Sequence, residues 1–349
     1  MNFLKKRARV QRPNCVGISR DFGILDVETQ FEASEHTWFG TVAGTVMCTL
    51  IVLHRCVPGR PLVIAANRDE FLDRPAAGPA LRMRDSGPIV APLDLEAGGT
   101  WLGLNGRGVF AGLTNLRPSE GLAAGPGPAP TLSVDLDDFR RAGGVARPGV
   151  RSRGEVVMAA LDAGSAADAA EAIVKLEEHA YNPFQLVVAD SRQAWLTVYR
   201  DRPRTWVLEP GIHVVGNVED ERIDAVLGAA QSEPPDSGGL EQPRARKLTR
   251  IRERVEKLLT ESSGDLFEDL AGVCREHVED HGKESPFEST CVHVAERYGT
   301  RSSLLLELAD VPETSRLWAT DGPPCERPFE NLSALLKELD VRSRTWIRG

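Results

Sequence analysis

The chain contains two pairs of short, β-branched apolar runs, and each pair is separated by a tight turn. Residues 48–54 and 61–66 flank a turn at 57–60, and residues 101–104 and 109–114 flank the turn that begins with Asn105 and Gly106. Asn-Gly between apolar runs is a strong short-range signal for a β-hairpin. The sequence therefore predicts two hairpins and antiparallel sheet, and it disfavours a strict βαβ alternation.

The remaining pattern mixes helices and strands. Apolar positions recur at helical spacing or in short β-branched runs, and both kinds of segment alternate down the chain. We expect helices at 153–163, 166–179, 219–230, 246–260 and 331–339, and strands at 184–189, 194–199, 205–209, 212–215, 291–295, 302–309 and 315–319. This order favours sheets packed between helical layers, in an α/β or α+β architecture.

Composition excludes several classes of partner. The formal charge of -9 gives no global basic footprint for nucleic acid or anionic lipid, and no phosphate loop or GxGxxG motif follows a strand. The sequence has no apolar run of the length that a membrane span needs. Six cysteines without paired CxxC spacing favour free thiols in a reducing compartment. We therefore expect a cytoplasmic protein without nucleic-acid or integral membrane association.

The first 46 residues differ in pattern from the rest of the chain. They begin with basic residues, including Lys5, Lys6 and Arg7, but they lack the apolar core of a secretory signal, and their acidic residues argue against a transit peptide. Two interpretations are open: a disordered pro-segment, or an upstream stretch that is translated in error. We expect one domain over residues 47–349, with a flexible Gly/Pro/Ala-rich insertion at about 119–150.

Cys48 follows Met47 directly and begins the first apolar run. If Met47 is the initiator, its removal leaves Cys48 with a free α-amine whose pKa is about 7.7–8.0. Such an amine can accept the proton of the thiol, so that one residue supplies both nucleophile and base. The alternative is that Cys48 is a small apolar residue in a buried strand, as most free cysteines are.

Four polar residues, Asn67, Arg68, Asp69 and Glu70, end the second run of the first hairpin. The positive charge of Arg68 would lower the pKa of the thiol, and Asp69 would orient the α-amine through a charge-assisted hydrogen bond. The alternative is a turn that carries a surface ion pair of about 0–1 kcal/mol.

Other residues with reactive side chains give weaker signals. Cys274, His277 and His281 have i, i+3, i+7 spacing and could face a zinc ion from one helix, but no fourth ligand is evident, and we predict no metal site. We expect His293 in the core or at a strand edge, and His54 and Cys56 exposed beside the first hairpin turn.

Several short motifs occur together in a fixed order. They are 47–51 (MCTLI), 66–71 (ANRDEF), 74–75 (RP), 97–103 (AGGTWLG), 113–115 (LTN), 152–154 (SRG) and 298–303 (YGTRSS). Over residues 47 to about 310 the chain resembles the NRDE-motif family, also called the transport and Golgi organisation protein 2 family. That family resembles the N-terminal nucleophile (Ntn) hydrolases, in particular their choloylglycine and penicillin acylase branch. The resemblance implies an α+β fold, a four-layer αββα sandwich.

The resemblance also implies roles for individual residues. Cys48 matches the nucleophile, Arg68 and Asp69 match the following Arg and Asp, Asn115 and Asn217 match the oxyanion positions, and Arg301 matches a late Arg. We expect Asn67, Glu70 and Trp101 to contact substrate. Two features depart from the family: Gly216 stands where a Ser is usual, and Cys48 has a free amine only if the preceding residues are absent or removed.

These observations predict a hydrolase in which Cys48 attacks the carbonyl carbon of a small amide or acyl substrate and water completes the turnover. An alternative is a non-catalytic protein that binds and delivers haem, a lipid or an acyl-CoA in the same pocket. A third is a protein that has lost catalysis. We expect no cofactor, with haem as an alternative bound ligand, and a small molecule as partner. The sequence leaves the oligomeric state open.

Overall fold

The computed structural model describes residues 39–40, 48–116, 132–133, 150–217, 241–262, 264–278 and 286–347. Contacts divide the chain into residues 1–38 and 39–349, and all of the described residues belong to the second unit. The expected N-terminal extension, most of the expected insertion at 119–150 and the expected helix at 219–230 lie outside the described residues.

The described strands form two large antiparallel sheets and one small pair. The first sheet has the order β12-β2-β3-β14-β15-β16, with β13 beside β14. Its strands are β2 (Cys48–Val57), β3 (Arg60–Phe71), β12 (Gly211–Val215), β13 (His293–Val294), β14 (Tyr298–Leu308), β15 (Arg316–Asp321) and β16 (Glu330–Asn331).

The second sheet has the order β11-β10-β9-β7-β6-β5-β4. Its strands are β4 (Ala76–Arg84), β5 (Gly87–Asp94), β6 (Leu102–Asn105), β7 (Phe110–Asn115), β9 (Phe184–Ala189), β10 (Ala194–Tyr199) and β11 (Pro203–Leu208). Two short strands, β1 (Phe39–Gly40) and β8 (Leu132–Ser133), pair with each other.

Both predicted hairpins are confirmed. β2 pairs antiparallel with β3 through a turn in which Gly59 has φ +72°, a conformation that glycine adopts without steric cost. β6 pairs with β7, and the side chain of Asn105 accepts hydrogen bonds from the backbone of Arg107 and Val109 inside the turn. The β2–β3 register sets Cys48 opposite Arg68.

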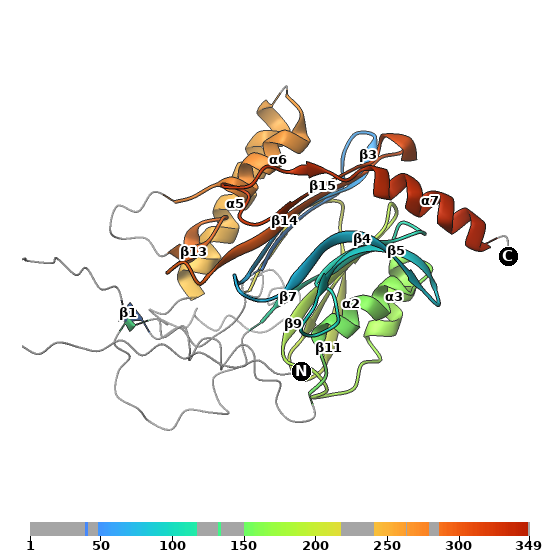
Figure 1. Ribbon diagram of the computed structural model, residues 1–349, viewed down its shortest axis with the longest axis horizontal. Helices are drawn as coiled ribbons and strands as arrows, with labels where there is room; N and C mark the ends of the chain where they lie inside the picture. The colour runs from blue at the N-terminus through green and yellow to red at the C-terminus, as the bar shows by residue number, and fades with distance from the viewer. Residues whose placement is uncertain are drawn as a thin grey trace, which may run out of the picture. The chain divides into compact units, whose positions relative to one another are not determined.

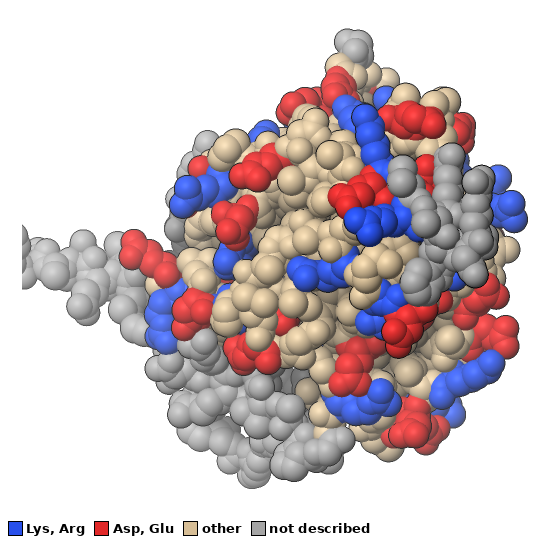
Figure 2. Space-filling view, turned by 45° about the vertical axis from the view of Figure 1, so that its right-hand side comes forward, with Lys and Arg blue, Asp and Glu red and all other residues tan. Residues whose placement is uncertain are grey.

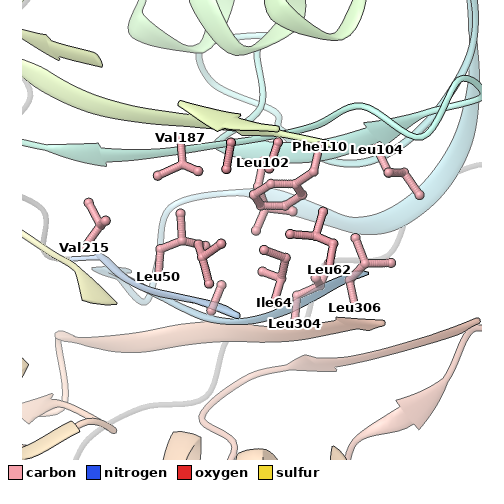
Figure 3. Close-up of a cluster of buried hydrophobic side chains, with 14 of the residues drawn as sticks. Leu50, Leu62, Ile64, Leu102, Leu104, Phe110, Val187, Val215, Leu304 and Leu306 are labelled. Carbon is pink, nitrogen blue, oxygen red and sulfur yellow. The ribbon is translucent and has the colours of Figure 1, made fainter. Parts of the chain in front are cut away.

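The two large sheets share a core of apolar side chains. Leu50, Leu62 and Ile64 come from the first sheet, and Phe110 and Val187 come from the second. Figure 3 shows these side chains pointing toward one another between the two sheets. Phe110 is completely buried, and truncation of such a residue to alanine costs about 3–5 kcal/mol. The burial of these side chains therefore fixes which face of each strand points into the core between the two sheets.

Helices cover the other face of each sheet (Figure 1). α2 (Arg153–Leu161) and α3 (Ala166–Ile173) pack on the sheet that contains β7 and β9. α5 (Glu241–Glu261) and α6 (Leu266–Arg275) pack on the sheet that contains β2 and β3. α7 (Ala334–Ile347) contacts β4, β5 and β15. The chain is α+β with antiparallel sheets, as predicted.

Some details differ from the sequence predictions. The β4–β5 hairpin was not predicted, because Gly78, Pro79 and Pro88 interrupt the alternation of its apolar residues. α3 ends at Ile173, well before residue 179. The expected exposure of His54 is wrong: its side chain is 1% exposed, because β2 continues to Val57 and is paired on both sides at this point.

The surface of the described residues is mixed in charge. On the face shown in Figure 2, Lys and Arg side chains are interspersed with Asp and Glu side chains among uncharged residues. Among the described helices, none is both long and apolar enough to cross a membrane.

Candidate active site

Cys48 is the first residue of β2, and its side chain lines a cavity of about 380 Å³. The residue is 4% exposed, and it faces the inner side of the sheet, as Leu50 does two positions later. The other described lining residues are Arg68, Glu70, Arg74, Asp94, Ala97, Gly99, Thr100, Trp101, Leu113, Asn115, Val150, Arg151, Ser152, Arg153, Gly154 and Asn182.

A network of ion pairs forms one wall of the cavity. Arg68 Nη2 lies 2.9 Å from Asp94 Oδ2 and 3.5 Å from Glu70 Oε2. Arg74 Nε lies 2.8 Å from the same oxygen of Asp94. The other carboxylate oxygen of Asp94 accepts hydrogen bonds from the backbone nitrogens of Glu96 and Ala97. Asp94 therefore connects the two arginines to the backbone of the 97–101 segment.

Arg153 is a wall residue that the sequence analysis did not single out. Its Nη1 donates a hydrogen bond to the backbone oxygen of Pro183 at 3.3 Å. Burial lowers the pKa of Arg153 to about 10, so its guanidinium stays charged at neutral pH. Within the described parts of the chain, no carboxylate forms an ion pair with Arg153. The 152–154 motif was the available signal, but it did not show where the side chain would point.

Two glycines bring the 97–101 and 152–154 motifs into contact. A Cβ atom placed on Gly154 would lie 3.0 Å from the Cα of Gly99, and one placed on Gly99 would lie 2.9 Å from the Cα of Gly154. Any side chain at either position would therefore push the two backbones apart. This contact explains why the two distant motifs form one wall of the Cys48 cavity.

The backbone nitrogen of Cys48 is held by Asn217. It donates a hydrogen bond to Asn217 Oδ1 at 3.0 Å, and Asn217 Nδ2 donates to the backbone oxygen of Asn115 at 2.6 Å. Asn217 can reach Cys48 because it follows β12, which pairs with the beginning of β2. Asn217 thus holds the Cys48 backbone nitrogen and is not among the cavity-lining residues, whereas Asn115 is.

Asp69 follows Arg68 in β3, and its side chain lies on the opposite face of the sheet. Thr300 Oγ1 donates to Asp69 Oδ1 at 2.6 Å, and Lys247 Nζ of α5 lies 3.6 Å from Asp69 Oδ2, just beyond hydrogen-bond distance. Burial raises the pKa of Asp69 to about 6 and lowers the pKa of Lys247. Lys247 and Thr300 are thus additional residues of the site. Thr300 lies in the 298–303 motif, which did not show where its side chain would point, and no local pattern marks Lys247.

The thiol of Cys48 is protonated at neutral pH in this environment. Burial and the nearby charge of Asp69 raise its pKa to about 12, although Arg68 and a hydrogen bond from the backbone of Asp69 act in the opposite direction. Because the thiolate is the nucleophilic form of cysteine, Cys48 needs a base close to its sulfur before it can attack a substrate.

The structure brings some of the predicted site residues together. Cys48, Arg68, Glu70, Trp101 and Asn115 all line the cavity. Asp69 and Asn217 lie directly behind it, where they contact Thr300 and the Cys48 backbone. The catalytic roles of all these residues stay predictions.

Asn67 and Arg301 lie elsewhere. Asn67 Nδ2 donates to the backbone oxygens of Cys274 and Thr290, at 3.0 and 2.9 Å, on the helix-covered face. Arg301 lies at a β-bulge in β14, and its side chain donates a hydrogen bond to Asp321. Arg301 lines a second cavity, which shares Arg68, Asp94 and Trp101 with the first. In this structure neither residue lines the Cys48 cavity.

Cys274 and His277, two of the three residues considered as helical metal ligands, do not lie on one helix. α6 ends at Arg275, so His277 lies beyond it, and His281 is outside the described residues. Cys274 is 1% exposed and packs in the core beneath α6. The helix predicted through these positions is too long because the apolar spacing continues past the last helical hydrogen bonds.

The chain belongs to the Transport and Golgi organisation 2 family, whose model matches residues 47–311. This match confirms the resemblance that the motifs indicated. A mouse Transport and Golgi organization 2 homolog is 32% identical over 165 residues, which is 45% of this chain and 50% of that protein. A bovine homolog is 28% identical over 261 residues, covering 70% of this chain and 81% of the relative. The chain thus spans about half the length of the mouse relative.

The solved structures with a similar fold include proteins that their titles describe as an acid amidase and a bile acid hydrolase. A Caenorhabditis elegans ortholog of N-acylethanolamine-hydrolyzing acid amidase superposes with a TM-score of 0.41 at 13% identity, over 74% of this chain and 92% of that one. A variant of the conjugated bile acid hydrolase from Clostridium perfringens has a TM-score of 0.49 at 12% identity, over 84% and 94%. Similarity at this level assigns no activity to this chain.

Proposed function

We propose that this family member uses Cys48 as an N-terminal nucleophile to cleave a small amide or acyl substrate. The observation that carries the proposal is the placement of Cys48: its side chain lines the cavity opposite Arg68, and its backbone nitrogen is held by Asn217. An N-terminal nucleophile needs both of these features on one residue: a thiol that faces the substrate cavity and a backbone nitrogen that is held in place.

The fold proposed with this function is the four-layer αββα sandwich of the Ntn hydrolases. The packing of α2 and α3 on one sheet, of the two sheets on each other, and of α5 and α6 on the outer face of the other sheet supports it. In such an arrangement the nucleophile lies at one end of a central strand, where both sheets contribute residues to the site.

The chemistry follows from a chain that begins at Cys48. The nitrogen that now donates to Asn217 becomes a free amine, which accepts the proton of the thiol. The thiolate attacks the carbonyl carbon, and the negative charge moves onto the carbonyl oxygen, to which the cavity-lining Asn115 would donate a hydrogen bond. A donor at that position contributes about 2.7–4 kcal/mol to catalysis. The amine proton passes to the leaving group, and water then hydrolyses the thioester.

The charges of the cavity favour a substrate with an anionic group. Four arginines and two carboxylates line it. The Arg153 guanidinium forms no ion pair with a carboxylate among the described residues, although the charge of Glu70 acts on it. A buried or half-buried guanidinium is a preferred partner of carboxylate and phosphate groups. The cavity volume of about 380 Å³ lies within the range of small-molecule sites. We therefore propose a small acyl substrate that places an anionic group beside Arg153.

The test uses the natively expressed protein and begins with its intact mass and N-terminal sequence. Protein that begins at Cys48 should form a covalent acyl adduct with an activated ester of a small dicarboxylic acid, and peptide mapping should place the adduct on Cys48. Cys48→Ala should abolish the adduct. Cys56→Ala is the matched control, because Cys56 is a free, half-buried cysteine near the other end of β2. A native chain that keeps its first 47 residues and forms no adduct would contradict the proposal.

A ligand carrier is the second candidate. Among the described residues of the cavity lining, Cys48 is the one whose side chain is of a type that binds haem iron, and we propose this sulfur as the ligand of a bound haem. A haem carrier should show a haem absorption shift that Cys48→Ala removes, without an acyl adduct. A carrier of lipid or acyl-CoA should keep its affinity in Cys48→Ala and release the ligand unchanged.

A further inference from the structure

Two cysteines and two histidines from separate segments meet at the β13 side of the first sheet. His277 follows α6, Cys291 and His293 belong to the segment that enters β13, and Cys325 follows β15. One side-chain ligand atom from each residue lies within 4.8 Å of the other three. The sequence does not suggest this cluster, because its members are separated by irregular intervals and come from three parts of the chain.

The distances match those between the ligands of one tetrahedral metal ion. Cys291 Sγ lies 3.5 Å from Cys325 Sγ and 3.6 Å from His293 Nε2, and His293 Nε2 lies 3.2 Å from Cys325 Sγ. The imidazole rings of His277 and His293 are 5.1 Å apart, centre to centre. Around a tetrahedral zinc ion, the usual bond lengths set two sulfurs about 3.8 Å apart and sulfur and nitrogen about 3.5 Å apart.

We propose that His277, Cys291, His293 and Cys325 bind one Zn²⁺ ion. Two thiolates and two imidazoles are a frequent ligand set of structural zinc sites, and four protein ligands leave no position open for substrate. Glu326 Oε1 lies 3.9 Å from His293 Nδ1, the ring nitrogen that does not face the sulfurs. Carboxylates near the second nitrogen of a ligating histidine commonly fix its orientation. The expectation of a chain without a metal site is thereby revised.

The zinc ion would hold the segment that supports Asp69. Val292 lies between the two ligands Cys291 and His293, and its backbone nitrogen donates to Thr300 Oγ1 at 2.9 Å. Thr300 in turn donates to Asp69 Oδ1. Thr290, the residue before Cys291, accepts the hydrogen bond of Asn67 through its backbone oxygen. Two of the four residues 67–70 are therefore attached to the segment that the metal would fix.

A disulfide between Cys291 and Cys325 is the competing interpretation. The two sulfurs would have to move from 3.5 Å to about 2.05 Å. A disulfide gives no reason for two histidines to approach the same pair of sulfurs, and its formation would consume both of the thiolates that a zinc ion needs. The two interpretations predict different masses and different metal contents.

The test is the metal content of the full chain, purified under reducing conditions without chelator and measured by mass spectrometry of the elements. We expect about one zinc ion per chain, and a loss of at least about tenfold in Cys325→Ser and His293→Ala. Both of these side chains are exposed, so their replacement leaves the core intact. Cys56→Ser is the control and should keep its zinc.

A second measurement keeps the proposal testable if a variant folds poorly. Unsubstituted protein reloaded with Co²⁺ should show the intense visible absorption of tetrahedral cobalt and a thiolate charge-transfer band, both displaced by zinc. Reduced protein that takes up neither zinc nor cobalt would overturn the proposal, as would a native mass about 2 Da below the reduced mass with a Cys291–Cys325 disulfide mapped by peptides. Neither measurement depends on the proposed reaction at Cys48.

Discussion

The two faces of β3 differ in what their polar residues do. On the inner face, Arg68 and Glu70 line the cavity with Cys48. On the outer face, Asn67 and Asp69 contact backbone and side chains of the elements that pack there, including Thr300 and Lys247. Four consecutive residues thus divide into two pairs, because side chains alternate across a strand.

The four residues 67–70 therefore have two separate roles. The inner pair has direct access to a bound molecule, whereas the outer pair joins β3 to α5, to β14 and to the segment at 290–293. Changes on the inner face should therefore alter kinetics with little change in stability, and changes on the outer face should alter the free energy of unfolding first. Four substitutions test this division, two on the outer face of β3 and two at residues of other elements that line the cavity.

Replacement of Cys48, the proposed nucleophile, should have the largest effect. Cys48→Ala should lower kcat for acyl transfer by up to about 10⁶-fold, as loss of a covalent nucleophile does elsewhere, which corresponds to about 8 kcal/mol of activation free energy. The midpoint of urea unfolding should change little, because alanine fits the small buried site. A Cys48→Ala protein that retains turnover would place the chemistry on another residue.

Asp69→Asn should raise stability at neutral pH. Since the pKa of Asp69 is raised from 3.8 to about 6 by burial, the folded state holds this proton more tightly than the unfolded state. The wild-type protein therefore loses stability as the pH rises through about 6, and Asn, which carries no charge, avoids up to about 3 kcal/mol of this loss.

The pH dependence checks the sign of that effect. In urea unfolding, the advantage of Asp69→Asn at pH 7 should shrink as the pH falls from about 6 to below 3.8, because wild-type Asp69 is protonated first in the folded state and then in the unfolded state over this range. A variant that is instead destabilised by about 3 kcal/mol or more at pH 7 would show that an unpaired Lys247 dominates.

Asn67→Ala should reduce stability with no direct effect on substrate binding. It removes hydrogen bonds to the backbone oxygens of Cys274 and Thr290, and both acceptors are buried. The expected cost is about 2 kcal/mol in the free energy of unfolding. At a temperature where the variant is folded, KM should equal that of the wild type. A large rise in KM without loss of stability would give Asn67 the substrate contact that the sequence predicted.

Arg153→Gln should have the smallest effect, and this effect should be limited to the binding of substrate. We expect KM for an anionic acyl substrate to rise about tenfold, or about 1.4 kcal/mol, with KM for a neutral analogue unchanged. Arg151→Gln is the control, because Arg151 also lines the cavity but is exposed and pairs with Glu155. Equal effects of the two substitutions would indicate a general charge effect and no specific contact by Arg153.

The local parts of the fold could be predicted from the sequence. Strands β9 and β10 match their predicted bounds, and both hairpins form where turn residues separate apolar runs. Cys48 and Arg68, two cavity-lining members of the predicted site, form a register pair within one hairpin. Such contacts are fixed by strand alternation and turn length, which the sequence displays directly.

Contacts between distant segments could not be predicted in this way. Lys247 reaches Asp69 from a helix whose sequence is typical of a solvated charged surface, and it is 4% exposed in the structure. The motif assigned Arg301 to the site, but Arg301 lies at a β-bulge and its side chain lines the neighbouring cavity. The positions of Lys247 and Arg301 depend on how α5 packs on β3 and how β14 pairs with it. The sequence of any one segment does not contain this information.

The contact between Gly99 and Gly154 also bears on how this cavity can evolve. Because the two segments touch through main-chain atoms, their spacing is set by the thickness of the peptide backbone, which is the same for every sequence. Point mutations at these two glycines can therefore not change the distance between the segments gradually. Even a methyl group, the smallest side chain, would push the two backbones apart. A change in substrate size has to come from exchangeable side chains such as Leu113 and Trp101, while the glycine pair keeps one dimension of the cavity constant among descendants of this chain.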